Sequence, residues 1–159
     1  MSKMTLHVDY EEFSDLEELS SDQKKLVLLA IEVARDAYAP YSGFYVGAAA
    51  LVENGEILTG NNQENAAYPS GLCAERVALF YAGSKYPGLK VLSIAIAAIE
   101  DGELVERPVS PCGGCRQVMH ETELRANHPV EIILYGKEKI RVIKRAADLL
   151  PLPFAFKKK

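Results

Sequence analysis

The sequence has no tryptophan, only three cysteines and three histidines, and no apolar run that could cross a membrane. Residues 37–52 form one of the longest stretches without a charge, but they are fewer than about 18 apolar residues and include Pro, Ser and Gly. The first residues, MSKMTLHVDYEEF, contain no apolar segment typical of a secretory signal. We therefore expect a cytoplasmic protein that does not contact a membrane.

The sequence also lacks a broad excess of positive charge. Its 159 residues include 18 Lys and Arg against 22 Asp and Glu, a formal net charge of −4. Six of the acids and one lysine fall in residues 1–20, which leaves 17 basic against 16 acidic residues elsewhere. Because nucleic acid backbones are bound by clustered Lys and Arg, this balance argues against a nucleic acid partner.

The length and composition are those of one globular domain. The chain has a mass of 17.5 kDa and 48% hydrophobic residues, enough to form a core of its own. Residues 1–19 are acidic and only weakly periodic, so we expect an extension with one short strand near residues 5–8. Residues 20–159 contain no repeat or linker, and we expect them to form a single domain.

Helical and strand patterns alternate along this domain. A capping residue among Ser20, Ser21 and Asp22 precedes apolar residues spaced by three and four, and Pro40 follows, which predicts a helix to about residue 38. Asn54-Gly55 predicts a hairpin between two strands. The remaining expected elements are helices at 73–82, 112–126 and 146–150 and strands at 45–52, 56–60, 90–99, 130–135 and 139–142. This order predicts an α/β fold, a three-layer α/β/α sandwich around a mixed, roughly five-stranded sheet.

All three cysteines fall where a helix is expected to begin. Cys73 opens one helix, and Cys112 and Cys115 open the next within the sequence Pro-Cys-Gly-Gly-Cys at 111–115. Free backbone N–H groups and the helix dipole lower the pKa of a thiol at this position. Three thiolates can hold zinc and leave the fourth tetrahedral position open for water, as catalytic zinc sites do.

Other interpretations of the cysteines have to be considered. Cys-x-x-Cys also occurs in redox pairs and in structural zinc sites. A redox pair would leave Cys73 unused. A closed structural site would need His7, His120 or His128 as fourth ligand, but His7 is in the acidic extension, His128 adjoins a proline, and His120 faces away from Cys115 on a regular helix. We therefore favour a catalytic zinc site.

Glu75 supports this interpretation. It lies two residues after Cys73, where its carboxylate can reach the open zinc position without binding the metal. A carboxylate there can accept and return a proton, which is general acid and base catalysis. By itself, an acidic residue in a first helical turn is explained by the helix dipole. Next to three candidate ligands, we interpret Glu75 as the catalytic residue.

These residues match the zinc deaminase signature, with Cys73-Ala74-Glu75 followed by Pro-Cys-x-x-Cys. From about residue 30 to 154, the sequence resembles the small three-cysteine cytidine deaminases that act on free nucleosides. The matching blocks are APYSGFYVGA at 39–48, NQENAAYP at 62–69, CAER at 73–76, SPCGGCRQ at 110–117 and LLP at 149–151. Gln63 replaces the family's usual apolar residue, and neither residues 1–19 nor the tail at 157–159 has a clear counterpart.

The resemblance implies an enzyme of pyrimidine salvage, a zinc-dependent hydrolase. It would convert cytidine and 2′-deoxycytidine to uridine and 2′-deoxyuridine with release of ammonia. One zinc ion per chain would activate the water, and Glu75 would transfer protons. By the same resemblance, Phe44 would stack on the pyrimidine, Asn62 and Glu64 would bind the ribose 3′-hydroxyl, and main-chain groups around Ala74 and Ser110 would hold the base edge.

The resemblance also assigns a role to Arg76, as a hydrogen-bond donor to the zinc thiolates. Three thiolates leave zinc with a formal charge of −1, which a guanidinium offsets in part. Without the resemblance, Arg76 would be interpreted as a surface ion-pair residue, and Asn62 and Glu64 as part of a surface loop. The small members of the family are homotetramers with shared sites, and Tyr68 and Phe154 are expected to make such shared contributions.

Two other classes of function are compatible with parts of the pattern. One is a zinc deaminase that acts on a polynucleotide or on an antibiotic nucleoside. The other is a non-catalytic binding module stabilised by zinc. The near-neutral body and the pair Asn62 and Glu64 argue against the first, and Glu75 argues against the second. No residue that we can name distinguishes cytidine from deoxycytidine.

Overall fold

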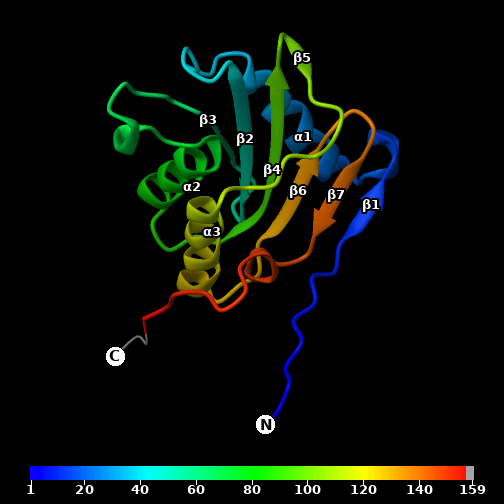
Figure 1. Ribbon diagram of the computed structural model, residues 1–159, viewed down its shortest axis with the longest axis vertical. Coiled ribbons are helices and arrows are strands. Elements are labelled where there is room, and N and C mark those ends of the chain that lie inside the picture. Colours follow the sequence, from blue (N-terminus) through cyan, green and yellow to red (C-terminus); the bar gives the residue numbers. More distant parts are fainter. Residues whose placement is uncertain (157–159) are drawn as a thin grey trace.

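A computed structural model describes residues 1–156, and a mixed seven-stranded sheet forms its centre (Figure 1). The strand order is β1-β7-β6-β4-β2-β3, and β5 pairs with β4 beyond this path. Only the pair β4 and β6 is parallel within the described sheet. The strands are β1 (Glu11–Phe13), β2 (Phe44–Val52), β3 (Ile57–Asn61), β4 (Val91–Glu100), β5 (Glu103–Leu104), β6 (Glu131–Tyr135) and β7 (Ile140–Ile143).

Helices cover both faces of the sheet. Helix α1 (Ser21–Ala34) packs on one face, and α2 (Ala74–Lys85) and α3 (Gly113–Ala126) pack on the other (Figure 1). Three short 3-10 helices, η1 (Leu16–Glu18), η2 (Tyr68–Ser70) and η3 (Ala146–Leu149), lie in the connections. The predicted three-layer α/β/α class is therefore confirmed, with two more strands than expected. No helix of the described chain is long and apolar enough to span a bilayer.

Small residues let the helices approach the sheet closely. Strand β2 carries alanines on both faces, with Ala49 toward α1 and its neighbours toward α2. At Gly47, an added Cβ would lie 2.0 Å from the carbonyl oxygen of Ala30 in α1. At Gly60, an added Cβ would lie 2.6 Å from the backbone nitrogen of Ala78 in α2. These glycines set the distance between the sheet and each helix, including the helix that begins after Cys73.

The connections after β3 and β4 bring the starts of α2 and α3 together. Strands β3 and β4 both run antiparallel to β2, so they run in the same direction. Helix α2 follows β3 in the chain, and α3 follows β4 and the short β5. Strand β5 runs antiparallel to β4, and the chain then passes through residues 105–112 before α3 begins beside the start of α2.

Two expected element boundaries are wrong at the N-terminal side. The strand expected at residues 5–8 is not formed, and β1 lies instead at Glu11–Phe13 against β7. There the Glu12 carboxylate accepts a hydrogen bond from Arg141 at 3.0 Å. Helix α1 ends at Ala34 rather than near residue 38, because residues 35–37 form tighter turns and Tyr38 pairs with Gln63. The lysine tail at 157–159 lies outside the described residues.

Candidate active site

The three cysteines converge at the N-termini of α2 and α3. Cys73 directly precedes α2, Cys112 directly precedes α3, and Cys115 is the third residue of α3. The Sγ atom of Cys112 lies 3.9 Å from that of Cys73 and 3.4 Å from that of Cys115, and all three lie within 4.8 Å of one another. Sulfurs bound tetrahedrally to zinc at about 2.3 Å are about 3.8 Å apart. The donor set and its spacing therefore fit one zinc ion.

The two helix N-termini favour thiolates at this cluster. Within the described chain, neither α2 nor α3 has a side chain that caps its first turn, so the positive ends of both helices face the sulfurs. The interaction with the Cys115 thiol lowers the pKa of Cys73, and Arg76 acts in the same direction. The same interaction raises the pKa of Cys115, with burial adding to it. These two directions favour negative charge on the Cys73 sulfur, at the N-terminus of α2.

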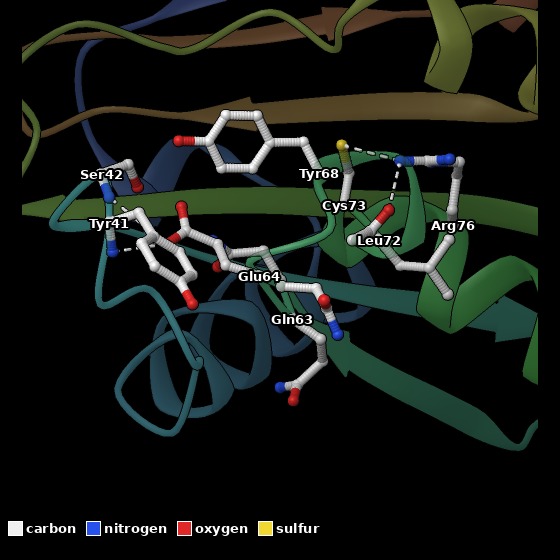
Figure 2. Close-up of a pocket in the computed structure, with 11 residues that line it drawn as sticks. Tyr41, Ser42, Gln63, Glu64, Tyr68, Leu72, Cys73 and Arg76 are labelled. Atoms are coloured by element: carbon white, nitrogen blue, oxygen red, sulfur yellow. Dashed lines mark hydrogen bonds between the residues drawn. The ribbon is translucent and has the colours of Figure 1, made fainter.

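Arg76 supplies a positive charge beside this cluster. Its Nη2 atom lies 3.6 Å from the Sγ atom of Cys73 and donates a hydrogen bond of 3.3 Å to the carbonyl oxygen of Gly71 (Figure 2). Its buried Nε atom has no partner among the described residues. Arg76 therefore lies where a guanidinium group can offset thiolate charge on Cys73, and its role toward a metal stays a prediction.

Glu75 is a buried carboxyl group next to the three sulfurs. It is the second residue of α2 and is only 5% exposed. Burial raises the pKa of its carboxyl group, and the negative charge on Cys73 acts in the same direction. Buried acids with perturbed pKa values in clefts are typical of catalytic sites. Its neighbourhood agrees with the predicted role in proton transfer.

A pocket with a volume of about 490 Å³ opens beside Cys73 and Arg76 (Figure 2). This volume is in the range of sites for small molecules. The opposite end of the pocket is formed by Glu64 and by the turn that contains Tyr41 and Ser42 (Figure 2). The pocket therefore joins the thiol cluster to a polar region that lies beyond β3.

Glu64 anchors this polar end. Its Oε2 atom accepts hydrogen bonds from the backbone N–H groups of Tyr41 at 2.9 Å and Ser42 at 3.3 Å. A hydrogen bond from the Ser42 side chain, together with these backbone bonds, lowers the pKa of the Glu64 carboxyl group. Glu64 is therefore a carboxylate at neutral pH, and its oxygens can accept a hydrogen bond from a hydroxyl group in the pocket.

Asn62 also lines the pocket, and its side-chain amide makes two hydrogen bonds to the protein backbone. The Oδ1 atom accepts from the N–H of Val46 at 2.7 Å, and the Nδ2 atom donates to the carbonyl oxygen of Phe44 at 2.9 Å. An amide side chain has a second N–H and a second lone pair, which these contacts leave available. Asn62 therefore holds the start of β2 and can still bind a ligand.

The other predicted substrate-binding residues lie at different places. Tyr68 is 78% exposed, lines the pocket and packs edge-to-face on Tyr41 with 6.3 Å between ring centroids. Phe44 begins β2, Ala74 is fully buried in α2, and Ser110 is exposed in the loop before Pro111. Phe154 is 66% exposed in the C-terminal segment. The pocket lining does not include Phe44, Ala74, Ser110 or Phe154.

The sequence did not predict the main-chain groups that position Glu64 and Arg76. Tyr41 and Ser42 hold Glu64 through their backbone N–H groups, and the Gly71 carbonyl oxygen accepts from Arg76. A sequence shows no direct signal for such main-chain contacts. The turn at 40–43 does carry an indirect signal, because Gly43 has a φ of +66°, which favours glycine.

The fold and the site together define a zinc-dependent hydrolase, with three thiols and a buried acid beside a small-molecule pocket that Cys73 lines. The model of the cytidine and deoxycytidylate deaminase zinc-binding region matches residues 20–128. Cytidine deaminase of Halalkalibacterium halodurans is 48% identical over 100 residues, which are 63% of this chain and 71% of that protein. Cytidine deaminase of Mycobacterium tuberculosis is 40% identical over 128 residues, 79% of this chain and 84% of that protein.

The solved structures agree with these sequence matches. The crystal structure of cytidine deaminase from Burkholderia pseudomallei superposes with a TM-score of 0.71 at 37% identity, and the match covers 86% of this chain and all of that one. The chain belongs to the zinc-dependent cytidine and deoxycytidylate deaminase family. The predicted family, fold class, type of enzyme and zinc cofactor are thereby confirmed. The roles of individual site residues stay predictions.

Proposed function

We propose that this protein hydrolyses free cytidine and 2′-deoxycytidine to uridine and 2′-deoxyuridine with release of ammonia. The observation that carries this proposal is a pocket lined by Glu64 and Asn62 and by Cys73, which belongs to a cluster of three thiols next to the buried Glu75. The relatives named cytidine deaminase support the same reaction.

The protein's own residues hold the metal and transfer the protons. Cys73, Cys112 and Cys115 would bind zinc, which when bound supplies Lewis-acid activation of the attacking water. Glu75 would accept a proton from that water and deliver it to N3 of cytosine. Later, Glu75 would carry a proton to the amino group, which leaves as ammonia. Its burial excludes bulk water, so protons move between Glu75 and the substrate rather than to solvent.

The polar end of the pocket favours a free nucleoside. Asn62 and Glu64 would bind the ribose 3′-hydroxyl, and Phe44 at the start of β2 would approach the base. A carboxylate at the 3′-hydroxyl would repel a 3′-phosphate, which every internal nucleotide of a polynucleotide carries. Outside residues 1–20 the chain has nearly equal numbers of basic and acidic residues, which is also unfavourable for binding a nucleic acid backbone.

Three further parts of the proposal concern the whole chain. Residues 20–159 would form a single deaminase domain, and residues 1–19 an acidic extension that adds the edge strand β1. The domain would assemble as a homotetramer in which Tyr68 and Phe154, both strongly exposed in one chain, are covered at shared sites. We propose a cytoplasmic location.

Substrate comparison tests this function. Protein loaded with zinc should change the ultraviolet absorbance of cytidine and deoxycytidine, while cytidine 3′-monophosphate and a short cytosine-containing oligonucleotide should be poor substrates. Turnover of the oligonucleotide at a rate equal to that of cytidine would favour the polynucleotide alternative. Zinc binding without turnover of any of these compounds would favour the non-catalytic module.

A further inference from the structure

Arg116 and Gln117, which directly follow Cys115, hold three main-chain carbonyl groups. The Arg116 Nε atom donates to the carbonyl oxygen of Pro111 at 2.8 Å, and its Nη1 atom donates to that of Leu149 at 2.9 Å. The Gln117 Nε2 atom donates to the carbonyl oxygen of Phe154 at 2.8 Å. The first of these carbonyls directly precedes Cys112, and the other two are more than thirty positions further along the chain.

The C-terminal segment, residues 150–156, has few other means of attachment. It contains no helix or strand, and its large side chains Leu152, Phe154 and Phe156 are 90%, 66% and 84% exposed. Burial of apolar surface therefore contributes little to holding this segment in one chain. The hydrogen bond from Arg116 holds Leu149, the last residue of η3 directly before this segment, and the hydrogen bond from Gln117 holds its middle.

The guanidinium group of Arg116 connects the carbonyl group of Pro111 to that of Leu149. Its donors lie in one plane at fixed angles, so the bonds to Pro111 and Leu149 cannot be optimised independently. A shift of either carbonyl reorients the group and weakens the other bond. Arg116 is half-buried, where loss of a hydrogen bond costs more than at the surface.

We propose that Arg116 is a positioning residue that couples the metal-binding loop at 111–115 to the C-terminal segment, with Gln117 extending the coupling to Phe154. The inference rests on the proposed function, because it takes zinc as the metal of the loop. Zinc binding and docking of residues 150–156 then stabilise each other, and by linkage each strengthens the other by the same factor.

Zinc affinity is the first measurement, by competition with a chromophoric chelator. We expect Arg116→Met, which removes both donors but keeps the apolar stem, to weaken zinc binding about 10-fold to 100-fold. Arg116→Lys retains one donor, so its loss should be smaller. The matched control is Arg125→Met, an exposed arginine in the last turn of α3, and it should stay within about twofold of wild type.

Cleavage by chymotrypsin after Phe154 is the second measurement, because Gln117 binds the carbonyl oxygen of that residue and a purely local role of Arg116 would not affect cleavage there. Zinc should slow this cleavage in wild type and have no such effect in Arg116→Met. Gln117→Leu leaves both Arg116 bonds intact, and it should speed cleavage after Phe154 and weaken zinc binding by a smaller factor. This variant keeps the test decisive if Arg116→Met does not fold.

The outcomes separate the inference from the proposed function. Variants that bind zinc as wild type does would overturn the coupling alone. Weakened zinc binding with unchanged cleavage after Phe154 would also overturn it, since Arg116 would then support only the loop. Wild-type protein that binds no zinc would overturn the proposed function and the coupling together.

Discussion

Replacement of Glu75 by glutamine should abolish most turnover while leaving the site intact. Glutamine has the shape of glutamate, so at a position that is 5% exposed the substitution creates neither a cavity nor a clash. It removes a buried carboxyl group that lies close enough to Cys73 and Cys115 to interact with both. Cys73, Cys112 and Cys115 are unchanged, so zinc content should stay at that of wild type.

The expected loss follows from the proton transfers assigned to Glu75. General acid and base catalysis contributes about 10²-fold to 10⁴-fold to a rate. At about 1.4 kcal/mol for each factor of ten, this loss corresponds to about 3–5 kcal/mol in the activation free energy. The loss should appear in kcat, with KM for cytidine little changed, because Glu75 is assigned to the chemical step and not to the ribose.

The assay is the decrease in cytidine absorbance at several substrate concentrations, with zinc content measured on the same samples. Glu121→Gln, a substitution at an exposed position of α3, controls for the general loss of one negative charge. A Glu75→Gln enzyme with kcat equal to that of wild type would refute the assigned role. Loss of zinc from this variant would show instead that Glu75 is a metal ligand.

Three further predictions concern binding and stability. Glu64→Gln should raise KM more than it lowers kcat. The pKa of the Glu64 carboxyl group is lowered, so the carboxylate persists and the KM of the wild-type enzyme should stay constant as the pH falls from 7 to 5.5. Kinetics of both proteins at each pH check these two expectations. Glu123→Ala leaves three backbone N–H groups, of Val130, Ala146 and Ala147, without their acceptor, which should cost about 3 kcal/mol and lower Tm by roughly 10 °C in calorimetry. Gly47→Ala should lower Tm because the added Cβ meets the backbone of α1. Gly83→Ala should leave Tm unchanged because its Cβ meets only the end of the Arg125 side chain. Equal Tm values for the two variants would contradict the packing argument.

The elements that sequence predicts well are those with local signals. Cys73 and Cys112 stand at helix starts as expected, because the structures that lead into both helices are encoded within a few residues, such as Pro111 before α3. The hairpin at Asn54-Gly55 joins β2 and β3 at the expected position. The chemical character of the site follows from residue types alone, since three thiols and an acid suit few reactions other than metal-assisted hydrolysis.

The features that sequence missed depend on partners far away in the chain. Strand β1 has no alternating pattern, and it forms by pairing with β7, where Glu12 contacts Arg141 on β7 and Lys139 directly before it. The segment at 5–8 has such a pattern but no strand beside it among residues 1–156. The contacts of Glu123 with Ala146 and Ala147, and of Arg116 with Leu149, join elements that no short-range pattern connects. Main-chain acceptors and donors of this kind carry no residue-type signature.

The most direct test of the central claim is to measure zinc content and cytidine turnover on the same purified wild-type protein. The account predicts about one zinc per chain, with uridine and ammonia formed in equal amounts and turnover lost on zinc removal and recovered on its return. Protein that holds one zinc per chain and leaves both cytidine and deoxycytidine unchanged would contradict it.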